Sequence, residues 1–139
     1  MLYAPERHCP SRLQIPMAAE SIHAGFPSPA ENYIEGTLSL DDLLIKHPSA
    51  TFFVKVAGDS MLGCGIHHGD RLVVDRSIEA KPGHVIIAVV NGELLVKRLQ
   101  RSKGMITLVA ENPDYPDLVV TEAMDFQVWG VVTAVIHLL

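Results

Sequence analysis

The sequence predicts a mainly β protein, in which a small curled β domain with short helices follows an extended N-terminal arm. Hydrophobic residues make up 48% of the chain and aromatic residues only 6%. Val, Ile, Leu and Ala must therefore build most of the core, which favours strands. From residue 50 onward, short β-branched and apolar runs alternate with turn signals, as in a compact sheet.

Proline distribution separates the arm from the domain. Five of the nine prolines fall within the first 30 residues, where they interrupt both helices and strand pairing. The full length of 139 residues suits one domain of ordinary size plus such an arm. We therefore expect an arm over residues 1–30 and a domain over residues 31–139.

Two short helices are predicted between the arm and the first strand. Residues 28–36, "SPAENYIEG", contain a capping serine, a proline at the first helical position and a closing glycine. Ser39 can cap a second helix, "LDDLLIKH", which Pro48 stops. Both segments are too short to be stable alone, so each must pack on the domain.

Seven strands are predicted after these helices. Asn91-Gly92 between two apolar runs indicates a tight hairpin, because a type I′ turn needs positive φ at both central residues. The predicted strands cover residues 50–57, 70–75, 84–90, 93–100, 105–112, 117–120 and 126–139.

Composition argues against several classes of function. The net charge of −5 gives no electrostatic reason to bind phosphate backbones, so direct DNA binding is not expected. The start of the chain lacks an apolar signal region, and the longest apolar run is too short to span a bilayer. We expect a soluble protein that stays in the cytoplasm.

Cysteines and histidines give no sign of a metal or cofactor. Cys9 and Cys64 lie in unlike contexts and indicate reduced thiols. Of the seven histidines only His67 and His68 are adjacent, and neighbouring residues rarely converge on one ion. The sequence therefore predicts no metal site and no cofactor.

A serine and a lysine are the candidates for chemistry. Ser60 follows a predicted strand and precedes a glycine-rich loop, and such a loop can aim amide N–H groups at a developing oxyanion. The Ser60 and Met61 amides are the candidate donors. Because a serine hydroxyl needs a base, and no His-Asp pair has an informative spacing, a neutral Lys97 is the candidate base.

Periodicity alone leaves the environment of Lys97 open. By the two-residue strand period it shares a face with Leu95 and Leu99, but Glu93 and Arg101 lie on that face too. Taken singly, each residue is better explained in the ordinary way, Ser60 as a turn serine and Lys97 as a solvated strand lysine.

A resemblance connects the two residues. The successive segments "VAGDSM", "GIHHGDRLVVD", "GELLVKRL", "ENPDYP" and "VWGVV" resemble the motifs of the LexA-like Ser/Lys autopeptidases, in order and over nearly the whole chain. This resemblance implies a mostly antiparallel fold, with Ser60 as nucleophile and Lys97 as general base. "AGFPSPAENY" resembles the self-cleavage segment, which places the scissile bond between Ala24 and Gly25.

The short arm points to one branch of this family. Only 23 residues precede Ala24, which leaves no room for a DNA-reading domain, and the chain lacks the membrane anchor of signal peptidases. The chain therefore resembles the UmuD-like subunits of error-prone polymerases, although Ala24 stands where cysteine is familiar in that branch. This resemblance implies a homodimer, self-cleavage stimulated by RecA filaments on single-stranded DNA, and a UmuC-like polymerase partner in translesion synthesis.

Two other functions stay open at this point. The chain could be a binding module with a vestigial peptidase site, whose arm covers a partner surface regardless of cleavage. A peptidase acting on other proteins is disfavoured, because the substrate segment is built in and tethering supplies a large effective concentration. Whether cleavage occurs within one subunit or between two is also open.

Overall fold

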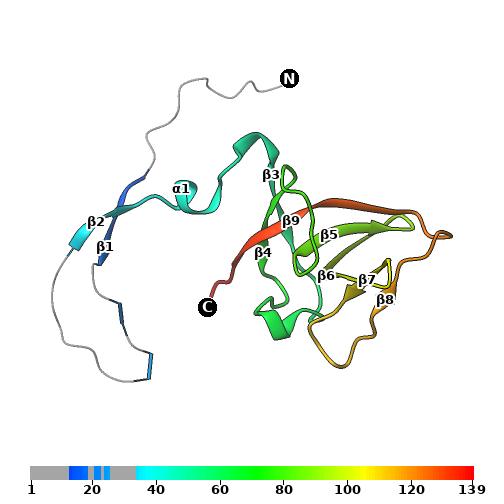
Figure 1. Ribbon diagram of the computed structural model, residues 1–139. Coiled ribbons are helices and arrows are strands. Elements are labelled where there is room, and N and C mark those ends of the chain that lie inside the picture. The colour runs from blue at the N-terminus through cyan, green and yellow to red at the C-terminus, as the bar shows by residue number, and fades with distance from the viewer. Residues whose placement is uncertain (1–12, 19–20, 23, 26–33) are drawn as a thin grey trace, which may run out of the picture. The chain divides into compact units, whose positions relative to one another are not determined.

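A computed structural model describes residues 13–18, 21–22, 24–25 and 34–139 (Figure 1). The chain divides into two compact units, Met1–Lys46 and His47–Leu139, which are described separately. The functional division after residue 30 stays a prediction.

The first unit contains a two-stranded antiparallel sheet that the sequence did not predict. Strand β1 (Ile15–Ala18) pairs with β2 (Ile34–Leu38), with Ile15 opposite Leu38. The helix predicted over residues 28–36 is therefore wrong for residues 34–36, and residues 28–33 lie outside the described part. β-Branched Ile34 and Thr37 favour a strand, and pairing with β1 outweighs the local capping signal.

The second predicted helix is confirmed in a shorter form. Helix α1 spans Leu40–Leu44, and Ser39 occupies its N-cap position without a side-chain hydrogen bond to the helix. Ile45 is already extended, so the helix ends at Leu44 and does not run up to Pro48 as predicted. A 3-10 turn, η1 (Pro48–Ala50), leads into the first strand of the second unit.

The second unit is one seven-stranded antiparallel sheet, and all seven predicted strands are confirmed. Its order is β3-β4-β9-β5-β6-β7-β8 (Figure 1). The hairpin between β5 and β6 turns at Asn91 and Gly92, whose φ values are 50° and 83°, as the type I′ signal predicts. The strands are β3 (Thr51–Lys55), β4 (Arg71–Asp75), β5 (Val85–Val90), β6 (Glu93–Ser102), β7 (Met105–Val109), β8 (Leu118–Val119) and β9 (Phe126–Ile136).

The sheet is curled and has a buried core on both faces. Ile87 of β5 belongs to one buried cluster, and its neighbour Ile86 belongs to the other. Val54 of β3 and Val96 of β6 pack against the same cluster as Ile87, although three strands separate β3 from β6 in the sheet order. The sheet therefore bends until β3 approaches β6, without closing into a barrel.

Two bulges in β9 contribute to this curvature. The pairing skips Trp129 opposite β5 and Thr133 opposite β4, and an unpaired residue bends its strand. Gly130 lies between the bulges, where a Cβ atom would stand 2.6 Å from the Val74 Cγ1 atom. Only glycine fits this crossing without displacing β4.

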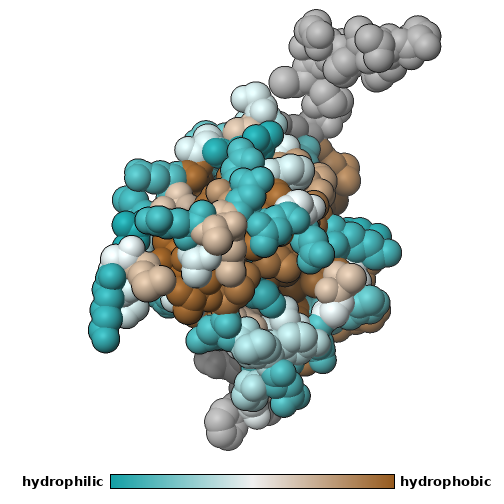
Figure 2. All heavy atoms as spheres, turned by 90° about the vertical axis from the view of Figure 1, so that its right-hand side faces the viewer, coloured by the Kyte–Doolittle hydropathy of each residue, from teal (hydrophilic) through white to brown (hydrophobic). Residues whose placement is uncertain are grey.

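The surface carries apolar as well as polar side chains. Figure 2 shows one face on which hydrophobic residues reach the surface among hydrophilic ones. In the part of the chain that the structure describes, no helix is long and apolar enough to cross a membrane.

Candidate active site

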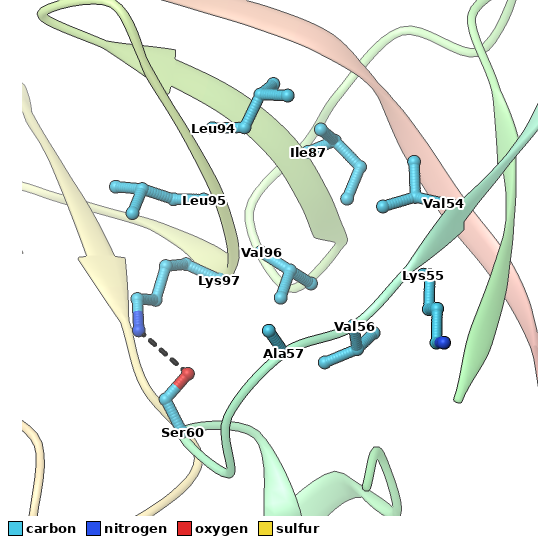
Figure 3. A pocket seen from close by; sticks show the side chains of 10 residues that line it. All are labelled: Val54, Lys55, Val56, Ala57, Ser60, Ile87, Leu94, Leu95, Val96 and Lys97. Carbon is cyan, nitrogen blue, oxygen red and sulfur yellow. Dashed lines mark hydrogen bonds between the residues drawn. The ribbon is translucent and has the colours of Figure 1, made fainter. Parts of the chain in front are cut away.

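The candidate site lies in a pocket of about 290 Å³ formed where the curled sheet brings β3 and β6 together. Figure 3 shows two extended segments facing each other across it. One is residues 54–57, at the end of β3, and the other is residues 94–97 of β6. Ile87 of β5 and Ser60 complete the lining.

Ser60 and Lys97, 37 positions apart in the chain, meet in this pocket. Ser60 lies in the loop after β3 and is half-buried, and Lys97 projects from β6 at the register position opposite Ile86. The Lys97 Nζ atom donates a hydrogen bond to the Ser60 Oγ atom at 3.0 Å (Figure 3). The structure thus brings together the two side chains that the sequence singled out.

The environment of Lys97 favours its neutral form. Burial lowers the pKa of Lys97 below its ordinary value of 10.5, because the pocket removes water from the ammonium group. Among the described residues, no carboxylate lies within salt-bridge distance of the Nζ atom to oppose this effect. The Tyr115 ring, with its centroid 5.6 Å away, is the aromatic neighbour of that atom. A lysine held in this way can accept a proton from the serine that it contacts.

The loop around Ser60 leaves two amide donors available. Within the described residues, neither the Ser60 nor the Met61 backbone N–H donates a hydrogen bond. The Met61 side chain is buried, and its carbonyl accepts from the N–H groups of Cys64 and Ile66, which fixes the loop. Two free N–H groups on a fixed loop are what an oxyanion requires, and their role stays a prediction.

Residues 111–116 hold the serine loop in place. The Glu111 N–H donates to the Ser60 carbonyl at 2.9 Å, and the Gly63 N–H donates to the Glu111 carbonyl at 2.6 Å. The Asn112 Nδ2 atom donates to the Asp59 carbonyl at 2.9 Å. These bonds join the serine loop to the chain after β7 on both sides of Ser60.

Tyr115 also holds the serine loop, through a hydrogen bond to the Asp59 side chain. Its hydroxyl donates to the Asp59 Oδ1 atom at 2.5 Å, and this bond to a carboxylate raises the pKa of Tyr115. "ENPDYP" is one of the motifs that carry the family resemblance, but the sequence alone gives its residues no role. The available signal was that Asn112 and Tyr115 each precede a proline between two strands, which is typical of a loop whose side chains can bind a neighbouring loop.

The predicted scissile pair belongs to the other unit. Ala24 and Gly25 are both exposed, and a Cβ atom added at Gly25 would meet no atom within 4 Å. Both residues lie in Met1–Lys46, whereas Ser60 and Lys97 lie in His47–Leu139.

Cys64 does not line the pocket. Cys64 is a free, half-buried thiol, and burial raises its pKa, so it stays protonated. Cys9 lies outside the described residues. One group with metal-ligand chemistry, His67, Asp70 and His137, lies apart from the residues that line the pocket.

The pocket can accept an extended peptide between two strand edges. Among the described residues, β3 pairs with β4 alone, and residues 93–97 of β6 pair with β5 alone, because the pairing of β6 with β7 begins at Arg98. The facing edges of both segments therefore have backbone groups available for a third strand. A peptide added there would pass the Ser60 hydroxyl.

Comparison with known proteins identifies the family. Residues 16–133 match the model described as Peptidase S24-like. The chain belongs to this family. It is 46% identical to protein SamA of Salmonella typhimurium over 99% of its own length and 94% of that protein. It is 42% identical to protein MucA of Escherichia coli, over 86% of this chain and 82% of that protein.

This chain is also similar to a repressor, but the match covers a smaller share of the repressor's length. The chain is 41% identical to the LexA repressor of Dechloromonas aromatica over 84% of this chain, which spans 58% of the repressor. The resemblance to LexA-like proteins is therefore confirmed, and the family supports serine peptidase chemistry.

Proposed function

We propose that this chain is a self-cleaving accessory subunit of an error-prone DNA polymerase in the SOS response. The observation that carries the proposal is the 3.0 Å contact between Lys97 Nζ and Ser60 Oγ, in a pocket that lowers the pKa of the lysine. Membership of the S24 family and the similarity to SamA and MucA, over 94% and 82% of their lengths, support it.

The proposed chemistry is acyl transfer with water as the final acceptor. Neutral Lys97 takes the hydroxyl proton as Ser60 Oγ attacks the Ala24 carbonyl carbon. The Ser60 and Met61 N–H groups stabilise the oxyanion. The intermediate breaks the C–N bond as Lys97 returns the proton to the Gly25 nitrogen, and an ester to Ser60 remains.

Hydrolysis of that ester completes the cycle. Lys97 removes a proton from water, the hydroxide attacks the ester carbonyl, and Ser60 recovers its proton as it leaves. The products are residues 1–24, with a new carboxylate at Ala24, and a fragment that begins at Gly25. The small side chains of this pair let the backbone enter a crowded site.

The remaining parts of the proposal concern partners and place. RecA filaments on single-stranded DNA stimulate the reaction by stabilising the docked arm, and the trimmed protein acts as a cytoplasmic homodimer with a UmuC-like polymerase in translesion synthesis. The competing proposal is a non-catalytic binding module whose arm masks a partner surface. Cleavage distinguishes the two.

The test is intact mass measurement after incubation with RecA filaments on single-stranded DNA. The proposal expects two fragments, with amino-terminal sequencing of the larger one starting at Gly25, and no fragments from Ser60→Ala. A chain that stays intact would support the binding module, and a different new terminus would refute the site assignment.

A further inference from the structure

Outside the residues that line the serine pocket, the chain brings a buried carboxylate and two imidazoles together at one end of the sheet. β4 begins at Arg71 and β9 ends at Ile136, and these two residues are register partners. The preceding Asp70 and the following His137 therefore face each other. His67 reaches the same point from the loop before β4. The sequence does not predict this convergence, since the three residues are not neighbours in the chain.

The distances within this group are short. The Asp70 Oδ1 atom lies 2.6 Å from His137 Nδ1, and the Asp70 Oδ2 atom lies 3.6 Å from His67 Nδ1. All three candidate ligand atoms lie within 4.8 Å of one another, and the two imidazole centroids are 4.6 Å apart. In a tetrahedral site with bonds of about 2.0–2.1 Å, ligand atoms stand about 3.3 Å apart.

The buried Asp70 carboxylate is fixed, whereas the two half-exposed imidazole rings can rotate. Asp70 is 3% exposed, and the His67 backbone N–H donates to its Oδ2 atom at 2.7 Å, which holds the carboxylate in place. The side chains of His67 and His137 are 49% and 42% exposed. Each ring can turn by the roughly 1 Å that coordination needs, because one side of it faces water.

The charge of the group suits a cation. Asp70 contributes a carboxylate to the group, and the two histidines contribute imidazole nitrogens. Two imidazoles and one carboxylate form the ligand class that binds Zn²⁺, Co²⁺ and Ni²⁺, with a fourth position left for water.

We propose that His67, Asp70 and His137 form a binding site for a divalent transition metal. The metal ties the loop before β4 to the end of β9. That loop connects directly to the serine segment, since Val56 N–H donates to the Asp70 carbonyl at 2.8 Å. Metal binding at this site does not require the chain to cleave itself. The proposal differs from the sequence-based expectation of no metal site.

The test is titration of the full chain with Co²⁺, followed by visible absorption and by thermal unfolding. We expect one saturable site per chain, a tetrahedral Co²⁺ spectrum and a higher melting temperature. His67→Ala and His137→Ala should each weaken the affinity roughly tenfold or more. Both side chains are half-exposed, so both variants should fold.

His68→Ala is the matched control. It removes the adjacent histidine, whose Nδ1 atom accepts from the Gly58 N–H and which does not belong to the group. It should bind Co²⁺ as the unmodified chain does. The proposal is overturned if the unmodified chain shows no saturable binding, if either cluster variant binds equally well, or if His68→Ala loses as much affinity.

Discussion

At the scale of single residues, burial explains how Lys97 can serve as the proposed base. An exposed lysine is almost fully protonated at neutral pH, and a protonated amine cannot accept the serine proton. The pKa of Lys97 is lowered by loss of water around the ammonium, not by a neighbouring positive charge. The shift depends on the closeness of β3 to β6, so this property of one residue derives from the curl of the sheet.

Tyr115 gives a prediction at the same scale. Tyr115→Phe keeps the ring near Lys97 but removes the hydroxyl that holds Asp59, beside the nucleophile. We expect stimulated cleavage to slow roughly tenfold, because small displacements of a nucleophile are costly. The melting temperature and the shape of the pH–rate profile should stay the same, since Lys97 keeps its environment.

Asp117→Asn is the control for this prediction. It changes an exposed carboxylate near Tyr115 in sequence and should leave the cleavage rate unaltered. Equal rates for Tyr115→Phe and the unmodified chain would mean that the Asp59 contact does not position Ser60.

At the scale of elements, the site depends on a close backbone approach between two loops. A Cβ atom added at Gly63 would lie 2.6 Å from the Glu111 carbonyl oxygen. Since the Glu111 N–H also holds the Ser60 carbonyl, pushing these loops apart displaces the nucleophile. Gly63 and Tyr115 thus both help to hold the serine loop against residues 111–116.

The prediction compares Gly63→Ala with Gly130→Ala. Both added methyl groups meet an atom at 2.6 Å, and both variants should lose about 1–3 kcal/mol of unfolding free energy. Gly130→Ala crowds Val74 in β4 and should still cleave under conditions where it is folded. Under conditions where it too is folded, Gly63→Ala should cleave much more slowly than Gly130→Ala. Urea unfolding and cleavage rates check both, and similar rates for the two variants would contradict the account.

The elements also show what the sequence could and could not predict. The seven strands of the large sheet were predictable, because β-branched runs and the Asn91-Gly92 turn are local signals. The β1–β2 sheet was missed, since its strands pair across 16–23 residues of chain and the capping pattern near Ser28 suggested a helix. For Ser60 and Lys97, strand periodicity left burial open, and only the ordered motifs linked them.

At the scale of the whole molecule, the two units carry different parts of the proposed reaction. Both buried clusters of the described residues lie within His47–Leu139, together with Ser60 and Lys97. The predicted scissile bond lies in Met1–Lys46. This separation suits a protein whose core must persist after the arm has been removed.

Removal of residues 1–24 tests this arrangement. The trimmed chain should unfold cooperatively, with a melting temperature within a few degrees of the full chain, because it keeps every residue of both clusters. Circular dichroism melts of the two forms measure the difference. A broad, non-cooperative transition in the trimmed form would mean that the arm contributes to the core.

The central claim, that Ser60 cleaves the chain with neutral Lys97 as its base, is tested most directly by the cleavage rate as a function of pH. The ratio of cleaved to intact chain is measured without filaments for the unmodified protein, Lys97→Ala and Lys97→Arg. The neutral fraction of Lys97 grows as pH rises towards and through its lowered folded-state pKa, so the unmodified rate should rise with pH and level off above that pKa. Lys97→Ala lacks the base, and Lys97→Arg stays protonated, so both should remain intact even at alkaline pH. Cleavage of Lys97→Ala at the unmodified rate, or a rate that does not change with pH, would contradict the account.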